Sequence, residues 1–431
     1  MDDTSDIVAV GFGPANLALA IAVEEHNAAA APEHRLRARF LERQPRFGWH
    51  RGMLLADATM QISFLKDLVT LRNPGSRFTF LTYLHERSRL VDFINHKTLF
   101  PTRLEFHDYL DWAAAEFADR VEYGATVTDI RPVVAGEQVV ALDVVAEGPA
   151  GRVVRRARNV VIGTGIEPVL PHGITRSPRV WHSSELLDRL SGPEGRAATA
   201  FAVIGAGQSS AEVAAYLHQQ VPDSQVHAIF SRYGYSPADD SPFANRVFDP
   251  AAVDEFFAAP ESVKEKFLHY HGNTNYSVVD VELIEDLYRR VYRERVAGHR
   301  RLHIHHLSQV TRVDERGDGV VLRVQAMAGE TGHDLAVDVV VCATGYRPME
   351  PDVVLGGVAD LCKRTGSGLF RIERDYRITT GDNVHCGIYL QGGTEHSHGL
   401  SSSLLSTSAV RAGEIVDSVA AGRKERAGVR S

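Results

Sequence analysis

The chain has 431 residues, of which 44% are hydrophobic and 24% charged, a composition that excludes a disordered or collagen-like protein. Lys and Arg total 47 against 55 Asp and Glu, so the net charge of −8 offers no broad attraction to nucleic acid or to an anionic membrane. No run approaches the roughly 20 apolar residues that span a bilayer, and the acidic start MDDTSD is unlike a signal peptide. We therefore expect a cytoplasmic protein of two or three domains.

The first predicted element is an apolar strand at residues 6–10 that runs into a glycine-rich turn and a helix. Gly11 and Gly13 let the backbone approach a pyrophosphate, which would lie at the N-terminus of the helix begun near Pro14. The next predicted strand ends in Glu42, a carboxylate suited to ribose hydroxyls that would repel a 2′-phosphate. The loop predicts a site for FAD or NAD, and a plain turn in an α/β fold is the alternative.

A second copy of this pattern begins at residue 201, where an apolar strand runs into Gly205 and Gly207. Gln208 and Ser209 follow at the start of a helix and are expected to contact the nucleotide. The next strand ends in Arg232, whose guanidinium can donate two charge-assisted hydrogen bonds to a 2′-phosphate. This loop predicts NADPH, and a surface arginine is the plainer alternative.

Two dinucleotide loops in one chain imply that a hydride passes from NADPH to a flavin. The cysteines Cys342, Cys362 and Cys386 form no CxxC or CxxxxC pair, which excludes a redox disulfide. The electrons must therefore go to oxygen, a quinone, another protein or the substrate.

The predicted fold class is α/β, with two Rossmann-like dinucleotide-binding domains and a small helical substrate-binding element. Apolar strands that run into glycine at residues 159–165 and 339–348 are typical of chain crossings between domains. We expect residues 1–195 to begin the FAD domain and residues 196–344 to form the NADPH domain, with a helical insertion at about 250–300. Residues 345–431 would complete the FAD domain and close the substrate site.

Five further motifs give the chain a resemblance to a known family: Trp49-His50, MQISFLKD at 60–67, NTNYS at 273–277, ATGY at 343–346 and HGLS at 398–401. With the glycine loops, they closely resemble the microbial N-hydroxylating flavin monooxygenases, and most of all the actinobacterial L-ornithine hydroxylases. The resemblance covers residues 6–416. It implies that FAD, NADPH and O2 form a C4a-hydroperoxyflavin, which the side-chain amine of the substrate attacks to give a hydroxylamine. It also implies a homo-oligomer, a tetramer or a dimer.

The resemblance assigns roles to individual residues. Lys66 and Asn245 would bind the substrate carboxylate, while Asn275 and Ser402 would contact the amine, with Ser401 and Ser403 as adjacent candidates. Gln61 and Asn275 would be catalytic. The cofactor contacts implied in addition are Trp49, His50, Gln61, Tyr276, Gly345 and Ser401. On the residues alone, Lys66 could equally be a solvated lysine and the asparagines turn residues.

The predicted function is N5-hydroxylation of L-ornithine for a hydroxamate siderophore or a related natural product. Lysine N6-hydroxylation and diamine N-hydroxylation are alternatives, because a pocket separates substrates that differ by one methylene by only about 1–3 kcal/mol. A non-catalytic redox sensor is a remote alternative. No metal is expected, because the histidines at 303–306 and 396–398 lack acidic or cysteine partners at ligand spacing.

Overall fold

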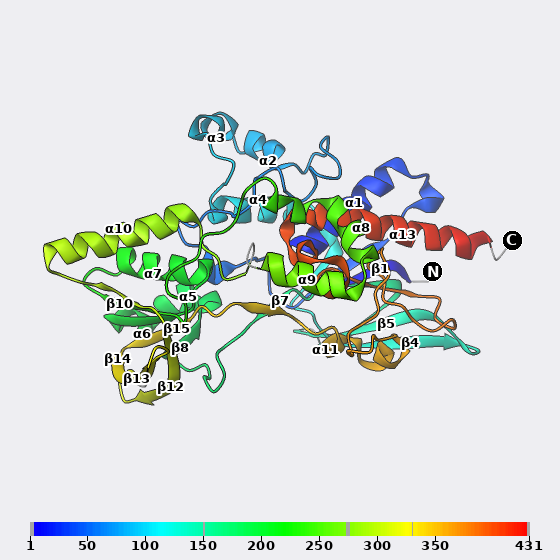
Figure 1. Cartoon of the computed structure of the whole chain (residues 1–431). Coiled ribbons are helices and arrows are strands. Elements are labelled where there is room, and N and C mark those ends of the chain that lie inside the picture. Colours follow the sequence, from blue (N-terminus) through cyan, green and yellow to red (C-terminus); the bar gives the residue numbers. More distant parts are fainter. Residues whose placement is uncertain (1–3, 150, 273–275, 330, 429–431) are drawn as a thin grey trace.

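The computed structural model describes residues 4–149, 151–272, 276–329 and 331–428, which form two lobes (Figure 1). The expected α/β fold with two Rossmann-type domains is confirmed. No helix within these ranges is long and apolar enough to cross a membrane.

The first lobe is built on a sheet with the strand order β3-β2-β1-β6-β5-β4, in which β17 also pairs with β6. The pairs β3–β2, β2–β1, β1–β6 and β6–β17 are parallel, and β4 and β5 extend the sheet in antiparallel fashion. The bounds are β1 Ser5–Val10, β2 Ala38–Glu42, β3 Val121–Tyr123, β4 Thr126–Ala135, β5 Gln138–Gly148, β6 Gly151–Ile162 and β17 Gly387–Leu390.

Burial of β1 on both faces explains why its sequence is apolar throughout. Ile7 and Ala9 pack into one core cluster, while Val8 and Val10 pack into the cluster on the other face, as the two-residue period of a strand requires. The two helices from opposite ends of the chain, α1 and α13, pack together on this sheet (Figure 1). The helices of this lobe are α1 Pro14–Ala29, α2 Phe80–Glu86, α3 Leu90–His96, α4 Arg103–Ala115, α11 Asp352–Leu355, α12 Glu395–His398 and α13 Ser408–Gly428.

The second lobe contains a parallel sheet with the order β11-β10-β9-β15-β8 and a three-stranded antiparallel sheet, β12-β13-β14. Its strands are β8 Val180–His182, β9 Ala200–Ile204, β10 Gln225–Ile229, β11 Leu302–His305, β12 Ser308–Arg316, β13 Gly319–Ala326, β14 Gly332–Val337 and β15 Val339–Cys342. Its helices are α5 Leu186–Leu190, α6 Pro193–Ala197, α7 Gln208–Gln220 and α10 Val281–Ala297.

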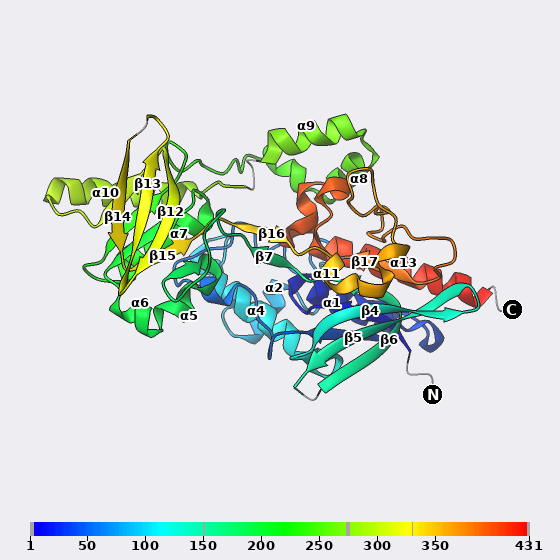
Figure 2. The same cartoon turned by 90° about the horizontal axis from the view of Figure 1, so that it is seen from below.

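The two lobes are joined by two short strands, β7 (Ile166–Pro168) and β16 (Tyr346–Pro348), which pair with each other in antiparallel fashion (Figure 2). Each follows one of the glycine-ended strands that the sequence predicts as crossings. The first crossing comes before residue 195, because β8 pairs with β15 and so belongs to the second lobe. The first crossing therefore lies before residue 180, earlier than the predicted boundary at residue 195, and β8, with the three residues VWH, is too short to signal a strand in the sequence.

The helical insertion expected at 250–300 is two separate structures. Helices α8 (Pro250–Ala258) and α9 (Glu261–His271) belong with the C-terminal segment, since α8 packs on α12 and on the short helix η8 (Leu400–Ser403). Helix α10 instead packs on α7 at the far side of the second lobe (Figure 2). An ion pair of 2.6 Å from Arg374 Nε to the Asp254 carboxylate fixes α8 to the first lobe.

Candidate active site

The loop after β1 has the geometry of a dinucleotide-binding turn. Gly11 has a φ of +85°, and a Cβ atom there would overlap the Gly163 carbonyl oxygen. Gly13 is the N-cap of α1 and carries no side chain that could satisfy the helix N-terminus, and Pro14 occupies the first turn. Asn16 donates to the carbonyls of Val10 and Gly11 at 3.0 and 2.8 Å. The free amides of α1 can therefore receive a pyrophosphate.

Glu42 lies beside this loop, as the sequence predicts. The carboxylate is 5% exposed, and its two oxygens accept hydrogen bonds from the amides of Phe12 and Gln44 at 2.6 and 2.8 Å. A carboxylate has about four acceptor positions, so capacity remains for ribose hydroxyls. A small cleft at the carboxyl ends of β6 and β17 is lined in part by Gly165 and Gln391, and Gln391 also donates to the Ala15 carbonyl at the start of α1 at 3.2 Å. Clefts of this kind bind nucleotides in open parallel sheets.

Trp49 and His50 lie where the first lobe meets the connecting strands. Their rings are 4.7 Å apart, and the ring of His50 meets the edge of Tyr346 at 5.8 Å. Burial and the neighbouring Arg103 guanidinium lower the pKa of His50 to about 4, so its imidazole is neutral at pH 7. Gly345 lies beside them, with its carbonyl 3.1 Å from His182 Nε2. The structure thus brings together three of the predicted cofactor positions.

The loop after β9 repeats the turn geometry of the first loop. Gly205 has a φ of +140°, and a Cβ atom there would overlap the Ala343 carbonyl oxygen. Gly207 is the N-cap of α7 and has no capping side chain. Both ends of the Gln208 amide are engaged within the lobe, since it accepts from Asp280 N at 2.9 Å and donates to Glu212 at 3.0 Å. Ser209 lies half-buried in the first helical turn.

Arg232 is half-buried, lies three residues beyond the end of β10, and donates from Nη1 to the Ser277 carbonyl at 2.7 Å. It forms no ion pair with another described residue, which leaves guanidinium donors for a phosphate. Tyr276, the preceding neighbour of Ser277, donates its hydroxyl proton to Glu395. The segment around 276–277 therefore connects Arg232 to the C-terminal segment of the first lobe.

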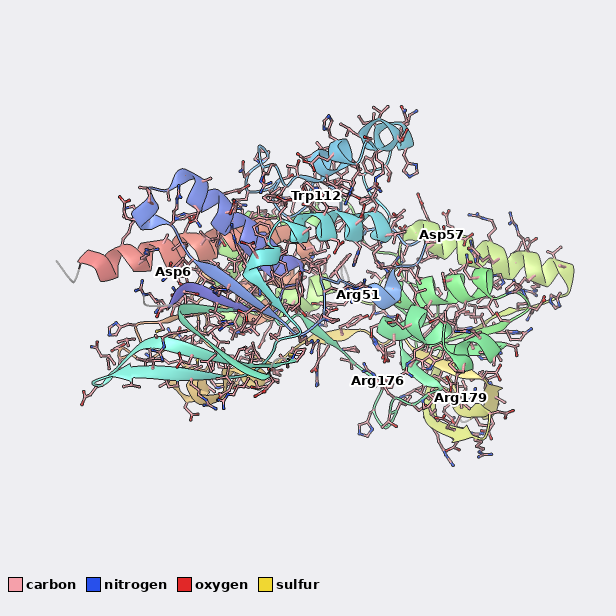
Figure 3. All side chains as sticks on the ribbon, turned by 180° about the vertical axis from the view of Figure 1, so that it is seen from behind. Asp6, Arg51, Asp57, Trp112, Arg176 and Arg179 are labelled. Atoms are coloured by element: carbon pink, nitrogen blue, oxygen red, sulfur yellow. The ribbon has the colours of Figure 1, made fainter. Side chains whose placement is uncertain are left out.

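A buried ion pair between the lobes was absent from the sequence prediction. Arg103 of α4 donates to both carboxylate oxygens of Glu212 on α7, at 2.9 and 2.8 Å, with side chains 12% and 4% exposed. A second contact runs from Gln219 Nε2 to Asp57 at 3.1 Å, near the junction in Figure 3. These partners are more than 100 residues apart, and no local pattern signals such a pair.

Lys66 and Asn245 lie on neighbouring elements. Lys66 Nζ is 6.0 Å from the ring centre of Phe248, the last residue of the short helix η5 (Ala244–Phe248), and Asn245 lies in the first turn of that helix. Asn245 Nδ2 donates to the Asp240 carbonyl at 2.7 Å. Lys66 forms no ion pair with another part of the described chain. Gln61 lies exposed in the same loop as Lys66, and Asn275 lies outside the described residues.

The loop that carries Lys66 is held by its neighbour Asp67, which is 3% exposed. Its carboxylate accepts from the amides of Val69, Thr70 and Phe80 and from the Thr70 hydroxyl, at 2.7–3.0 Å. Burial raises the pKa of Asp67, while these hydrogen bonds act against that shift. Asp67 ends the MQISFLKD motif, but no role for it was predicted from the sequence.

Ser401 and Ser402 are buried in η8, which packs against η5. The Ser401 carbonyl accepts from the Thr407 hydroxyl at 2.8 Å. The Ser402 hydroxyl is buried yet has no hydrogen-bond partner among the described residues. Buried polar groups are normally paired, so this hydroxyl is suited to a bound molecule. The elements that carry Lys66, Asn245 and Ser402 thus meet around η5.

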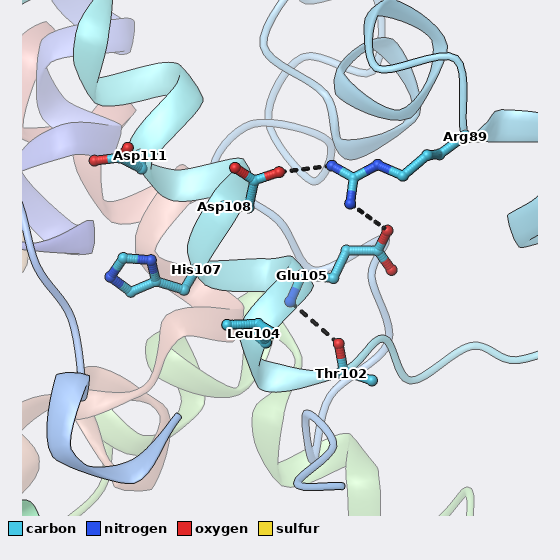
Figure 4. A pocket seen from close by; sticks show the side chains of 7 residues that line it. All are labelled: Arg89, Thr102, Leu104, Glu105, His107, Asp108 and Asp111. Carbon is cyan, nitrogen blue, oxygen red and sulfur yellow. Dashed lines mark hydrogen bonds and ion pairs between the residues drawn. The ribbon is translucent and has the colours of Figure 1, made fainter. Parts of the chain in front are cut away.

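A depression of the surface lies elsewhere, on α4 (Figure 4). It is lined by Arg89, Thr102, Leu104, Glu105, His107, Asp108 and Asp111, and none of these is a predicted site residue. Three of its charged side chains pair with one another, since Arg89 reaches Asp108 at 2.6 Å and Glu105 at 3.4 Å. It is therefore distinct from the candidate site. No group of three or more His, Cys, Asp or Glu side chains in the described part of the chain could hold a metal ion.

Comparison with known proteins gives consistent results along the chain. Residues 3–348 match the family model for L-lysine 6-monooxygenase/L-ornithine 5-monooxygenase. An L-ornithine N(5)-monooxygenase of Burkholderia cepacia is 43% identical, over 91% of this chain and 89% of that protein. The structure of an ornithine N-hydroxylase of Kutzneria sp. 744 with reduced FAD, NADP+ and L-ornithine is 51% identical, with a TM-score of 0.92 over 96% of this chain and 99% of that one. The L-lysine 6-monooxygenase of Pseudomonas syringae is 31% identical, with a TM-score of 0.85 over 97% and 99%.

Proposed function

Because the chain belongs to the L-lysine 6-monooxygenase/L-ornithine 5-monooxygenase family, we propose that it is a flavin-dependent enzyme that hydroxylates the N5 amine of L-ornithine. The observation that carries the proposal is the meeting of three elements around η5. Lys66 lies near Phe248, Asn245 lies on the same short helix, and η8, which carries the Ser402 hydroxyl without a partner among the described residues, packs against that helix.

The two glycine loops fit FAD and NADPH respectively. The α1 loop with Glu42 would hold the pyrophosphate and ribose of FAD, because both glycines leave the helix amides open and the acid is fixed beside them. The α7 loop with Arg232 would hold NADPH. When bound, the flavin takes a hydride from NADPH and activates O2, which supplies the oxygen atom of the product.

The substrate site supports an amino acid with a neutral side-chain amine. The Lys66 ammonium has no competing ion pair within the described chain, so it can bind the substrate carboxylate. At the other end, Ser402 offers a hydroxyl and Asn275 would offer an amide, both uncharged. An uncharged environment favours the amine over the ammonium, and only the amine has a lone pair for attack on oxygen.

Ornithine is favoured over the alternative substrates. Identity is 51% to the Kutzneria ornithine hydroxylase but 31% to the Pseudomonas syringae lysine enzyme, at similar coverage. A diamine has no carboxylate and would leave Lys66 without a counter-charge. The redox-sensor alternative does not explain why both nucleotide loops and Lys66 are intact.

The wider setting of the enzyme forms part of the same proposal. The family resemblance supports a homo-oligomer, either a tetramer or a dimer, acting in the cytoplasm. Its hydroxylamine product would then be acylated to a hydroxamate, as siderophore synthesis requires.

The test is to purify the protein with FAD and follow NADPH oxidation in the presence of L-ornithine, L-lysine or putrescine. We expect hydroxylamine product in step with NADPH only for ornithine, and hydrogen peroxide for the other amines. Release of peroxide alone with every amine contradicts the proposal. Equal coupling with lysine contradicts the choice of substrate while retaining the reaction.

A further inference from the structure

Arg411 lies in the first turn of α13 and is almost fully buried, although none of the roles assigned so far involves it. Its side chain is 2% exposed. It donates from Nε to Gln391 Oε1 at 2.7 Å, from Nη1 to the Ser402 carbonyl, and from Nη2 to the Ser408 hydroxyl at 3.4 Å. Every hydrogen-bond partner of this guanidinium is therefore an uncharged group.

Other arginines of the same region differ in this respect. Arg374 pairs with the carboxylates of Glu414 and Asp254, and Arg423, three turns further along α13, pairs with Asp6. Arg411 forms no ion pair with the described residues, although its guanidinium lies 5.9 Å from the ring centre of Tyr376. Burial lowers the pKa of Arg411, and the nearby Tyr376 and Glu414 act against that shift. A buried charge without an ion pair is costly to fold around, so a role that only fills space would be served better by an apolar side chain.

The partners of Arg411 lead to the two parts of the candidate site. Gln391 follows β17, lines the cleft beside the FAD loop, and donates from Nε2 to the Ala15 carbonyl in the first turn of α1 at 3.2 Å. Ser402 lies in η8 and carries the buried hydroxyl that has no partner among the described residues. One side chain thus links the helix that begins at the FAD loop to the segment predicted to meet the substrate amine.

We propose that Arg411 is a positioning residue that fixes the backbone of η8 so that the Ser402 hydroxyl meets the substrate amine in register with the flavin. The inference rests on the proposed function. Arg411 does not touch the reacting atoms. It acts on them through the Ser402 carbonyl and through Gln391.

The test compares Arg411→Met and Arg411→Lys with the matched control Arg423→Met, which removes an arginine that binds Asp6 and lies at the opposite end of the same helix. The measurements are the KM for ornithine, the rate of flavin reduction by NADPH, the fraction of NADPH recovered as hydroxylamine, and the melting temperature. For Arg411→Met we expect the KM to rise about tenfold, with more peroxide and nearly unchanged flavin reduction. Lysine keeps the charge and one donor, so Arg411→Lys should show a smaller increase in KM. Arg423→Met should lower the melting temperature alone.

A second measurement separates positioning from general stability. The KM effects of Ser402→Ala and Arg411→Met should be far from additive, because Arg411 is inferred to act through Ser402. Additive effects, or an unchanged KM together with a lower melting temperature, overturn the inference and leave Arg411 a structural residue. If Arg411→Met does not fold, the KM of Arg411→Lys tests the inference instead. An unchanged KM for ornithine in that variant also overturns the positioning role of Arg411. Failure of the proposed function is seen separately, as wild-type protein that produces only peroxide from ornithine.

Discussion

The two glycine loops have similar backbone conformations but differ in the residues that form hydrogen bonds with them. In each, the first glycine has a positive φ and packs against a carbonyl of one crossing segment, Gly11 on Gly163 and Gly205 on Ala343. The α1 loop is closed by residues next to it, since the Glu42 carboxylate holds the Phe12 amide.

The α7 loop depends on residues from distant parts of its lobe. Asp280 binds Gln208, and Ser277 binds Arg232. Both loops are largely half-buried, but in the first Phe12 is fully buried and its amide is held by Glu42. The more enclosed first loop suits a cofactor that stays bound, whereas the second suits one that enters and leaves in every turnover. The two loops should therefore fail separately and in different ways.

The largest expected effect is the loss of FAD from Glu42→Ala. The substitution leaves the Phe12 and Gln44 amides without their acceptor in a buried place and removes the ribose contact. We expect FAD affinity to fall by about 3 kcal/mol, or about 150-fold. The measurement is the flavin-to-protein ratio after dialysis, with Glu42→Gln as the control because its amide oxygen still accepts one hydrogen bond. Full retention of FAD in Glu42→Ala contradicts the assignment of this loop.

Arg232→Ala should affect the other loop alone. Loss of the guanidinium removes charge-assisted hydrogen bonds to the 2′-phosphate. The binding free energy lost is about 2.5 kcal/mol, so the KM for NADPH should rise roughly 70-fold. NADH lacks this phosphate, and its KM should stay nearly constant. Arg246→Ala is the control, because Arg246 is more exposed and pairs with Asp249. A parallel loss with both nucleotides would mean that Arg232 acts on the Ser277 loop and not on the phosphate.

Lys66→Ala tests whether substrate binding is independent of both loops. Loss of the ammonium should weaken the binding of ornithine by about 2 kcal/mol and so raise its KM about 30-fold. The rate of flavin reduction by NADPH should stay nearly unchanged. Lys264→Ala is the matched control, because Lys264 Nζ lies 5.7 Å from the ring centre of Phe256, much as Lys66 Nζ lies near the ring of Phe248. An equal loss of flavin reduction would place Lys66 in the nucleotide site.

The features that could be predicted from the sequence are those with a local signal. The turns at Gly11 and Gly205 each lie in a continuous strand–turn–helix pattern, and the structure has a strand before and a helix after both of them. Strand β2 ends at Glu42 as expected, whereas β10 ends at Ile229, three residues before Arg232. The crossings also carried a local signal, since each apolar strand ran into glycine before β7 or β16.

Long-range pairing explains what was missed. Arg103 meets Glu212 across the lobes, and Arg411 meets Gln391 and Ser402, but nothing in the neighbouring sequence of any of them marks the partner. The same reason accounts for residues 250–300, where α8 and α10, separated in sequence by α9, pack on different lobes. The roles of Lys66, Asn245 and Ser402 came from resemblance, because isolated polar residues in loops give no chemical pattern of their own.

The smallest expected effect is the loss of stability at low pH, which depends on buried neutral histidines in both lobes. Burial lowers the pKa of His398 in the first lobe and of His227 and His305 in the second to about 4. The unfolded chain takes up protons near pH 6.5 while the folded chain resists, so these groups favour folding above that pH and oppose it progressively as the pH falls towards 4. Between pH 7.5 and 6.0 the free energy of unfolding lost for a fully buried histidine is below about 1 kcal/mol.

His398 is such a group, stacked on Tyr376 with ring centres 4.1 Å apart. The melting temperature of His398→Gln should therefore fall less over this interval than that of the wild type, and an equal fall would mean that His398 is already protonated in the folded protein.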